Sequence, residues 1–273
     1  MDIEATLQLL ADDPTTPVDV AEVALLLATD EYPDLDVSFY LRQLDLLALE
    51  VRPHLSGDLE SRVAELAQFL FEEKGYQGNS PYYYDPGNSY FNEVLDRRLG
   101  IPITLSALAM SVGHRAGMQV AGVGLPGHFI AKATEGAEEV LFDPFHGGQI
   151  LTPVGCQSLV EAVTGQSIPL TPSLFEATPP GWIIMRMLNN LKGIYLTQED
   201  FPRAIRVVGR LRLLAPTDVT LRRDLGVALL RSGKPGQAID HLTAYLDGNP
   251  SATDEALVQQ VLDKARIEVA KWN

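Results

Sequence analysis

The chain has 273 residues, a net charge of −15 and a hydrophobic fraction of 46%. These values allow one large domain or two to three small ones with a sizeable core. The negative charge opposes binding to nucleic acid and to anionic membranes, so we expect neither as a partner. The single cysteine, Cys156, excludes an internal disulfide framework and favours a reducing, cytoplasmic location.

The N-terminal sequence MDIEATLQLLADD has no basic leader and no long apolar run, which argues against a secretory signal. No stretch approaches the roughly 18 apolar residues that a membrane helix needs, so we expect no membrane insertion. The charge is uneven, because residues 1–75 hold 17 acids against four bases, whereas residues 186–273 hold 10 acids against 13 bases. Such an acidic region is a solvated surface or, alternatively, a docking face for a basic partner.

Helical periodicity dominates the first part of the chain. We expect an acidic helical segment over residues 1–57, which includes the amphipathic stretch VSFYLRQLDLLALEVRPHL. Asp58 is a suitable N-cap for a helix over SRVAELAQFLFEEKG, and Gly75 follows its expected end.

The next segment, YQGNSPYYYDPGNSY, has no helical period and is rich in turn-forming residues and tyrosine. We expect an ordered loop whose tyrosines pack against the protein or line a cleft. Two helices should follow, a short one over SYFNEVLDRR and a longer one over GIPITLSALAMSVGHRAG, with Gly100 before it, Pro102 in its first turn and Gly117 at its end. The expected buried face of the longer helix consists of Leu105, Leu108, Ala109 and Val112.

Short apolar stretches then predict strands. These are MQVAGVGL, HFIAKAT and EVLFDPF, with QILTP as a further edge and TEGAEE as a hairpin turn. Helices followed by neighbouring strands indicate a mostly helical α+β fold whose core, over residues 58–170, contains a small antiparallel sheet. The proline-rich segment LTPSLFEATPPGW is expected to be a linker.

The C-terminal part, within residues 171–273, repeats with a period of 34 residues, which is the period of tetratricopeptide repeats. Gly226 and Ala238 are small where two helices of the second unit should cross, whereas Lys192 takes the corresponding place of Gly226 in the first unit. The segment EALVQQVLDKARIEVAKW would cap the stack. Such repeats either bind a peptide or brace the core, and both readings stay open. The equivalent pairs are Leu191 with Leu225, Tyr195 with Leu229, Ala204 with Ala238, and Pro216 with Pro250.

Three motifs lie in the middle of the chain: NSYFNEVLDRRLGIPITLSALAMSVGHRAG, VGLPGHFIAKA and LFDPFHGG. Together they resemble the transglutaminase-like superfamily, and in particular a divergent bacterial branch fused to tetratricopeptide repeats, the Sir-B type. The likeness is close over roughly residues 60–155 and looser over the repeats. It implies a papain-type, transglutaminase-like core of helices and a small antiparallel sheet.

The resemblance also implies a chemistry that needs cysteine, histidine and aspartate in that chain order, with the cysteine at a helix N-terminus. His128 matches the histidine and Asp143 matches the aspartate. The cysteine is missing, because its place falls near Pro102 or Ile103. Cys156 follows Asp143 and so breaks the chain order; we expect it to be a small buried apolar residue. The nearby hydroxyl groups, which are alternative nucleophiles, belong to Thr104 and Ser106.

The retained pair has two readings. His128 and Asp143 are either a base with its orienting carboxylate or a hydrogen-bonded pair that joins two strands; without a thiol we favour the structural or ligand-binding role. His146 lies three residues after Asp143, but no known ligand spacing accompanies it, so the sequence predicts no metal site and no cofactor.

The segment from Asn88 to Glu93 resembles the family signature that precedes the nucleophile helix. Asn88 and Asn92 would lie near the N-terminus of that helix, where an amide caps the helix or donates to a bound carbonyl. We favour capping. Together with Tyr90 and Glu93 they form the set of candidate binding residues.

The sequence therefore supports three functional hypotheses. The first, which we favour, is a non-catalytic, pseudoenzyme-like protein-binding module, an adaptor, assembly factor or regulator whose partner is a protein or peptide. The second is a hydrolase or acyltransferase acting on amide or ester bonds, with His128, Asp143 and a hydroxyl nucleophile. The third is a purely structural protein in which the pair only stabilises the sheet.

Overall fold

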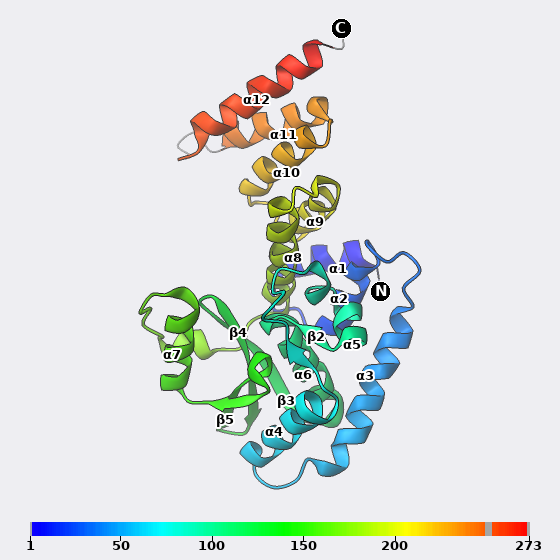
Figure 1. Ribbon diagram of the computed structural model, residues 1–273, viewed down its shortest axis with the longest axis vertical. Helices are drawn as coiled ribbons and strands as arrows, with labels where there is room; N and C mark the ends of the chain where they lie inside the picture. Colours follow the sequence, from blue (N-terminus) through cyan, green and yellow to red (C-terminus); the bar gives the residue numbers. More distant parts are fainter. Residues whose placement is uncertain (1, 249–252, 272–273) are drawn as a thin grey trace. The chain divides into compact units, whose positions relative to one another are not determined.

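The computed structural model describes residues 2–248 and 253–271, and its helices and strands form two compact units (Figure 1). One unit is Thr15–Met187, and the other combines Met1–Pro14 with Leu188–Asn273. The mostly helical α+β fold expected from the sequence is confirmed. The expected division at residues 57 and 170 follows sequence composition and stays a prediction.

Aspartates begin the helices of the acidic region. Helices α2 (Val20–Ala28), α3 (Val37–Val51) and α4 (Leu59–Ala67) follow Asp19, Asp36 and Asp58, and each of these carboxylates accepts a hydrogen bond from a backbone N–H of the first helical turn. A carboxylate there satisfies an unpaired donor and interacts favourably with the helix dipole. Part of the acidic bias of residues 1–75 therefore serves helix capping, and the N-cap expected at Asp58 is confirmed.

Helix α4 ends earlier than its pattern predicts. A π-helical turn, Gln68–Glu73, continues the chain, and Gly75 follows with a φ of +73°. The loop after it contains strand β1 (Gln77–Gly78) and a 3-10 turn, Pro86–Asn88. Strand β1 pairs in parallel with β2 (Leu99–Gly100), which follows helix α5 (Phe91–Arg97). No pattern in the sequence indicates this small parallel pair.

Helix α6 (Pro102–Ala116) is the centre of the Thr15–Met187 unit. Pro102 occupies its first turn, and Gly117 ends it with a φ of +96°, as expected. The four residues expected on its buried face are buried, but burial extends around the helix to 13 residues. Helix α3 covers one side and strands β3 and β4 cover another. A Cβ on Gly113 would lie 2.6 Å from Val120 Cγ2, so the helix and the sheet approach closely.

The four predicted strands form one antiparallel sheet with the order β3-β4-β5-β6. Its strands are β3 (Gln119–Leu125), β4 (His128–Glu135), β5 (Glu138–Asp143) and β6 (Gln149–Leu151). The turn expected in TEGAEE is confirmed, because Glu135 pairs with Glu138 and Gly136 adopts a φ of +59°. The turn between β3 and β4 pairs Leu125 with His128.

The segment expected to be a linker packs on the sheet instead. Helix α7 (Pro153–Thr164) follows β6, and a 3-10 turn, Pro172–Phe175, contacts β3. The Thr178 N–H donates to the Gly122 carbonyl at 2.8 Å, and its hydroxyl accepts from the Gly124 N–H at 2.9 Å. The segment therefore satisfies polar backbone groups along the edge of β3 and belongs to this unit.

The second unit contains the repeats. Helix α8 (Pro180–Thr197) enters it, followed by α9 (Phe201–Leu214), α10 (Thr220–Arg231), α11 (Pro235–Gly248) and α12 (Glu255–Ala270), and α1 (Ile3–Asp12) packs on α9. Each of α9 to α12 contacts its neighbour in sequence, and Figure 1 shows α10, α11 and α12 stacked in this order. The repeat positions Leu191, Leu225, Tyr195, Leu229, Ala204 and Ala238 are buried. Pro216 is exposed, and Pro250 lies outside the described residues.

The junctions between these helices follow the repeat pattern. A Cβ on Gly226 would lie 2.6 Å from Leu242 Cγ, which explains why a glycine occurs where α10 crosses α11. Lys192, at the equivalent position of the first repeat, directs its Nζ to Asp224 Oδ2 at 3.0 Å. The larger residue therefore forms an ion pair between the first and second repeats.

Candidate functional site

The candidate site lies in the Thr15–Met187 unit, where the end of the sheet meets the loop before α5. The two central strands, β4 and β5, are antiparallel neighbours, so His128 at the start of β4 and Asp143 at the end of β5 lie at the same end of the sheet. The His128 Nε2 lies 2.9 Å from Asp143 Oδ2. Both side chains are buried, with exposed fractions of 3% and 1%. The structure thus brings together the two residues that the sequence singled out.

A second histidine shares the same carboxylate. The 3-10 turn η4 (Pro144–His146) follows Asp143, and His146 Nδ1 lies 2.7 Å from Asp143 Oδ2. The two imidazole rings stack with their centroids 5.7 Å apart and an interplanar angle of 24°. Burial opposes ionisation of Asp143, but the hydrogen bonds and charges of the two histidines outweigh it, so the pKa of this carboxyl lies below its ordinary value.

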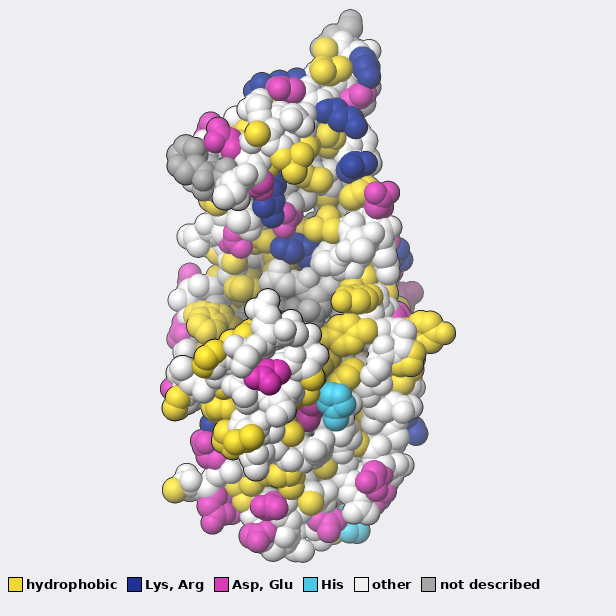
Figure 2. Space-filling view, turned by 60° about the vertical axis from the view of Figure 1, so that its left-hand side comes forward, with side chains coloured by type: hydrophobic (Ala, Val, Ile, Leu, Met, Phe, Trp, Pro, Cys, Tyr) yellow, Lys and Arg dark blue, Asp and Glu magenta, His cyan; other side chains and the backbone are white. Residues whose placement is uncertain are grey.

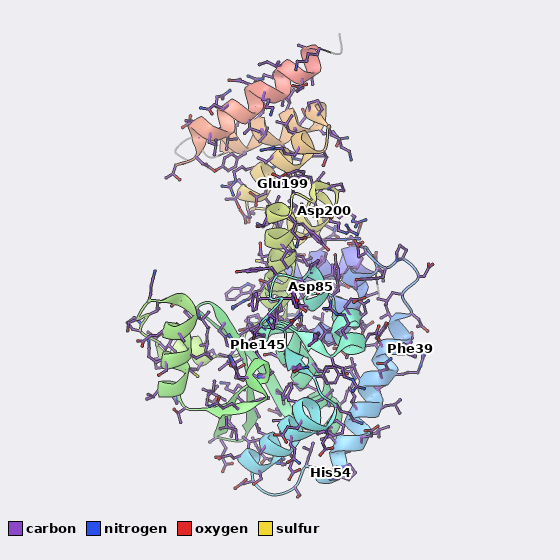
Figure 3. All side chains as sticks on the ribbon, in the orientation of Figure 1. Phe39, His54, Asp85, Phe145, Glu199 and Asp200 are labelled. Carbon is purple, nitrogen blue, oxygen red and sulfur yellow. The ribbon has the colours of Figure 1, made fainter. Side chains whose placement is uncertain are left out.

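Aromatic rings cover this group. Phe145 packs edge-on against both histidine rings, with centroid distances of 6.0 Å to His128 and 5.2 Å to His146. Tyr83, from the loop before α5, packs edge-on against Phe145 with centroids 6.1 Å apart. Figure 3 labels Phe145, and Asp85 from the loop that contains Tyr83. The tyrosine-rich segment is therefore an ordered wall of the site.

Arg186 supports the site from helix α8. Its guanidinium donates to the His128 carbonyl at 2.7 Å and lies over the Phe129 ring at 5.3 Å. Burial lowers the pKa of this guanidinium below its ordinary range, although Tyr83 acts in the opposite direction. No carboxylate pairs with it among the described residues. Arg186 thus fixes the backbone at the start of β4.

The loop before α5 is held by amide side chains. Asn79 donates to the side-chain oxygen of Asn88 at 2.9 Å, and Asn88 donates to the carbonyls of Tyr82 and Tyr83 at 2.7 Å and 3.2 Å. The role predicted for Asn88 and Asn92 is to cap the nucleophile helix, which corresponds to α6. That helix is capped by Thr104 instead, and the Asn88 amide holds the loop.

A model of the transglutaminase-like superfamily matches residues 38–189, and a tetratricopeptide-repeat model matches residues 191–263. The chain belongs to the transglutaminase-like superfamily. A UPF0162 protein of Xylella fastidiosa is 35% identical over 257 residues, which cover 91% of this chain and 89% of that protein. A UPF0162 protein of Vibrio cholerae is 26% identical, covering 80% and 81% of the two chains.

The likeness extends beyond bacteria. F-box only protein 21 of Mus musculus is 31% identical over 143 residues, which cover 49% of this chain and 22% of that protein. No solved structure matches the chain. These findings confirm the expected divergent branch in which a transglutaminase-like core precedes tetratricopeptide repeats.

Pro102 and Ile103, near which the family resemblance predicts the cysteine, lie at the start of α6 and are both buried. The Thr104 hydroxyl is occupied, because it accepts from the Ile101 N–H at 3.0 Å and lies 2.9 Å from the Asn88 carbonyl. Thr104 is therefore the residue that caps α6. The Ser106 hydroxyl is fully buried and has no hydrogen-bond partner among the described residues.

Cys156 lies on α7 and belongs to a hydrophobic cluster with Val123, Ile130 and Val160. It is fully buried, as the sequence predicts. Burial, reinforced by the charge of Asp143, raises the pKa of the thiol to about 11. A thiol that stays protonated is a poor nucleophile.

The other candidate binding residues have varied surroundings. Asn92 is buried, and its side-chain oxygen has no partner among the described residues. Tyr90 packs edge-on against Tyr32, and Glu93 lies 3.9 Å from Arg97. Sequence reasoning missed two features: the contact of Arg186 with the His128 carbonyl, and the hydrogen bond by which His146 shares the Asp143 carboxylate with His128. The short separation of His146 and Asp143 in the sequence was a signal for the second feature, whereas no local pattern indicated the first.

Among residues 2–248 and 253–271, every helix is too short or too polar to span a membrane.

On the face shown in Figure 2, hydrophobic side chains gather beside an exposed histidine. The large hydrophobic side chains exposed in the Thr15–Met187 unit include Tyr82, Tyr84, Ile150, Val154 and Trp182. Exposed aromatic and aliphatic side chains are frequent at protein-binding surfaces.

Proposed function

We propose that the chain is a non-catalytic, transglutaminase-like protein-binding module that acts as an adaptor, assembly factor or regulator. The observation that carries this proposal is the start of α6, where Pro102 and Ile103 stand in place of the family cysteine. Neither side chain has an atom that can attack a carbonyl. The tetratricopeptide-repeat model over residues 191–263 supports protein interaction as the role.

The available hydroxyl groups give no obvious replacement. Thr104 is engaged in capping α6, and the buried Ser106 hydroxyl makes no hydrogen bond with His128. An alcohol needs a well-placed base to become a nucleophile. The lack of such a contact favours the binding role over a hydroxyl-based hydrolase or acyltransferase.

The retained pair has a use that needs no catalysis. Asp143 joins the start of β4 to the end of β5 through His128, and its other oxygen accepts from the Phe145 N–H at 3.0 Å. These bonds hold the turn that carries Phe145 and His146. The pair therefore supports the shape of a site bordered by exposed tyrosines, which suits binding of a protein or peptide.

A covalent serine- and threonine-directed probe tests the catalytic alternative. We expect a fluorophosphonate to leave the folded wild-type chain unlabelled, and ester or amide turnover to be equal in wild type and His128→Gln. Labelling at Ser106 or Thr104 that disappears in a folded His128→Gln variant would overturn the non-catalytic proposal. Circular dichroism and the melting temperature establish that the variant is folded.

Binding is tested with a pair of surface variants. Tyr82, 74% exposed, lies on the loop beside the site, whereas Leu49, 62% exposed, lies on α3. A protein captured from an extract of the source cells is purified and titrated against each variant. We expect Tyr82→Ser to weaken binding at least tenfold, an energy of about 1.4 kcal/mol, and Leu49→Ser to bind like the wild type. If no purified protein binds, or if both variants bind equally, the site is not the interaction surface.

A cytoplasmic location stays a prediction from the sequence, based on the single cysteine.

A further inference from the structure

Three side chains converge on one point at the end of the sheet. Each of His128, Asp143 and His146 offers a ligand atom, and these atoms all lie within 4.8 Å of one another. The carboxylate oxygen Oδ2 is central, because His128 Nε2 lies 2.9 Å from it and His146 Nδ1 lies 2.7 Å from it. The chain contributes these groups from the start of β4, the end of β5 and the turn η4.

The second histidine is not needed for the histidine–aspartate pair that the family resemblance implies. A base with its orienting carboxylate, or a bond between two strands, requires only His128 and Asp143. His146 adds a second imidazole on the same oxygen, and the two rings are stacked. Two imidazoles and a carboxylate form a ligand set that Zn²⁺ and other late first-row divalent ions accept.

The geometry is close to what a metal ion requires. In a tetrahedral zinc site with bonds near 2.1 Å, neighbouring ligand atoms are roughly 3.4 Å apart. Side-chain rotation has to open the two nitrogen–oxygen distances, 2.9 Å and 2.7 Å, to that value and to bring the two nitrogens, which lie within 4.8 Å of each other, to the same separation. Before an ion binds, each nearer nitrogen carries the proton of its hydrogen bond to Asp143. When an ion binds, each ring carries its proton on the other nitrogen, and the nearer nitrogen offers its lone pair to the ion.

The surroundings supply support and access. The Phe145 N–H holds the second oxygen of Asp143 at 3.0 Å, and Arg186 holds the His128 carbonyl at 2.7 Å. Such outer contacts orient metal ligands. His128 and Asp143 are buried, whereas the His146 side chain is 48% exposed, so an ion can enter from solvent on the His146 side.

We propose that His128, Asp143 and His146 bind one divalent first-row transition-metal ion of the zinc class. Three protein ligands leave a further coordination position for water or for a donor atom of a bound partner. Mg²⁺ and Ca²⁺ are disfavoured because they prefer sets of oxygen ligands. This inference goes beyond the proposed function, since the site can hold an ion whether or not the chain binds a protein there.

Cobalt titration tests the site, because Co²⁺ takes the same ligands and absorbs visible light when coordinated. Tag-free full-length protein is treated with a chelator, dialysed and titrated with Co²⁺ and then Zn²⁺. We expect one Co²⁺ per chain, displacement by Zn²⁺ and a melting temperature that rises with Zn²⁺. Loss of an outer-shell partner typically costs roughly 10- to 100-fold in affinity, so loss of a direct ligand in His146→Ala should cost at least about 100-fold.

The matched control is His54→Ala, because His54 is also exposed but lies in the turn after α3. Its affinity for Co²⁺ should equal that of the wild type. Imidazole resonances of the wild type, followed by NMR during Zn²⁺ addition, give a readout that requires no variant: those of His128 and His146 should shift. No one-to-one binding, or binding that survives in His146→Ala, would overturn the inference. The fluorophosphonate result on the proposed function is unaffected by either outcome.

Discussion

The two units use charged and polar side chains in different ways. In the repeat unit, ion pairs join alternate helices of the stack: Lys192 of α8 donates to Asp224 of α10, and Arg223 of α10 donates to Asp254 at the start of α12. In the Thr15–Met187 unit, the buried polar groups join distant parts of the chain, as when Asn88 binds the start of α6 and Asp143 binds His128. The first arrangement stabilises a stack, whereas the second builds a site.

This difference explains where each unit is sensitive to substitution. A repeat stack depends on each pair of helices in turn, so a local change affects one junction. The site depends on a turn that is held from several sides. We therefore expect the largest effects at the turn after η4 and smaller effects within the repeats.

Gly148→Ala should have the largest effect on stability. Gly148 has a φ of +77°, and a Cβ there would overlap the Ala67 side chain and lie 2.9 Å from Phe71 Cδ2. We expect a loss of about 3 kcal/mol in unfolding free energy, from overpacking and from the left-handed backbone. Gly147, with a φ of +72° and open space within 4 Å of an added Cβ, is the control, and Gly147→Ala should cost only about 1 kcal/mol. Urea unfolding followed by circular dichroism measures both; equal losses would show that the contact with α4 is unimportant.

Cys156 should react with a thiol reagent far more slowly in the folded chain than in urea. A pKa of about 11 leaves roughly 100-fold less thiolate at pH 8 than an ordinary thiol has, which corresponds to about 2.7 kcal/mol. The pKa is raised in the folded state, so the unfolded state loses the proton first and the thiol's contribution to stability falls as the pH rises from about 9 towards 11. Labelling at equal rates in the folded and unfolded chains would mean that Cys156 is accessible and that a thiol-based reaction must be reconsidered.

The parts of the fold that sequence predicted are those marked locally. Pro102 and Gly117 mark the two ends of α6, Asp58 begins α4, and the 34-residue period indicates the repeats. The proline, glycine and aspartate signals act within one or two turns of the chain, through a fixed φ, a missing Cβ or a cap, whereas the period is visible because the same pattern of residues recurs.

The parts that sequence could not predict depend on long-range contacts. The segment containing Thr178 looks like a linker because its prolines prevent regular structure, yet its hydrogen bonds to Gly122 and Gly124 place it along β3. The amide of Asn88 is equally suited to capping, and only the folded loop directs it to Tyr82 and Tyr83. The pairing of His128 with Asp143 was expected from the family resemblance, but the shared oxygen with His146 required the geometry of η4.

Within the repeats, Gly226→Ala should destabilise the chain by about 2 kcal/mol, because the added Cβ would lie 2.6 Å from Leu242 Cγ and 3.3 Å from its backbone nitrogen. The control is Gly209→Ala in α9, where nothing lies within 4 Å of the new Cβ. There the better helix propensity of alanine should stabilise the chain by about 1 kcal/mol. Urea unfolding of the two variants should thus give changes of opposite sign, and a shared sign would contradict the close crossing of α10 and α11.

The smallest effect should come from the ion pair between the repeats. Lys192→Met removes the 3.0 Å contact with Asp224, but Arg223 Nη2 remains 2.8 Å from the other oxygen of that carboxylate. The loss should therefore be only about 1 kcal/mol, below the cost of leaving a buried charge without any partner. A double-mutant cycle with Asp224→Asn isolates the coupling energy between Lys192 and Asp224. The control is Lys264→Met at an exposed position of α12, which should change the unfolding free energy by less than about 0.5 kcal/mol. A loss well above that of the control would mean that Arg223 does not compensate, and that the repeat unit, like the site, depends on individual buried polar contacts.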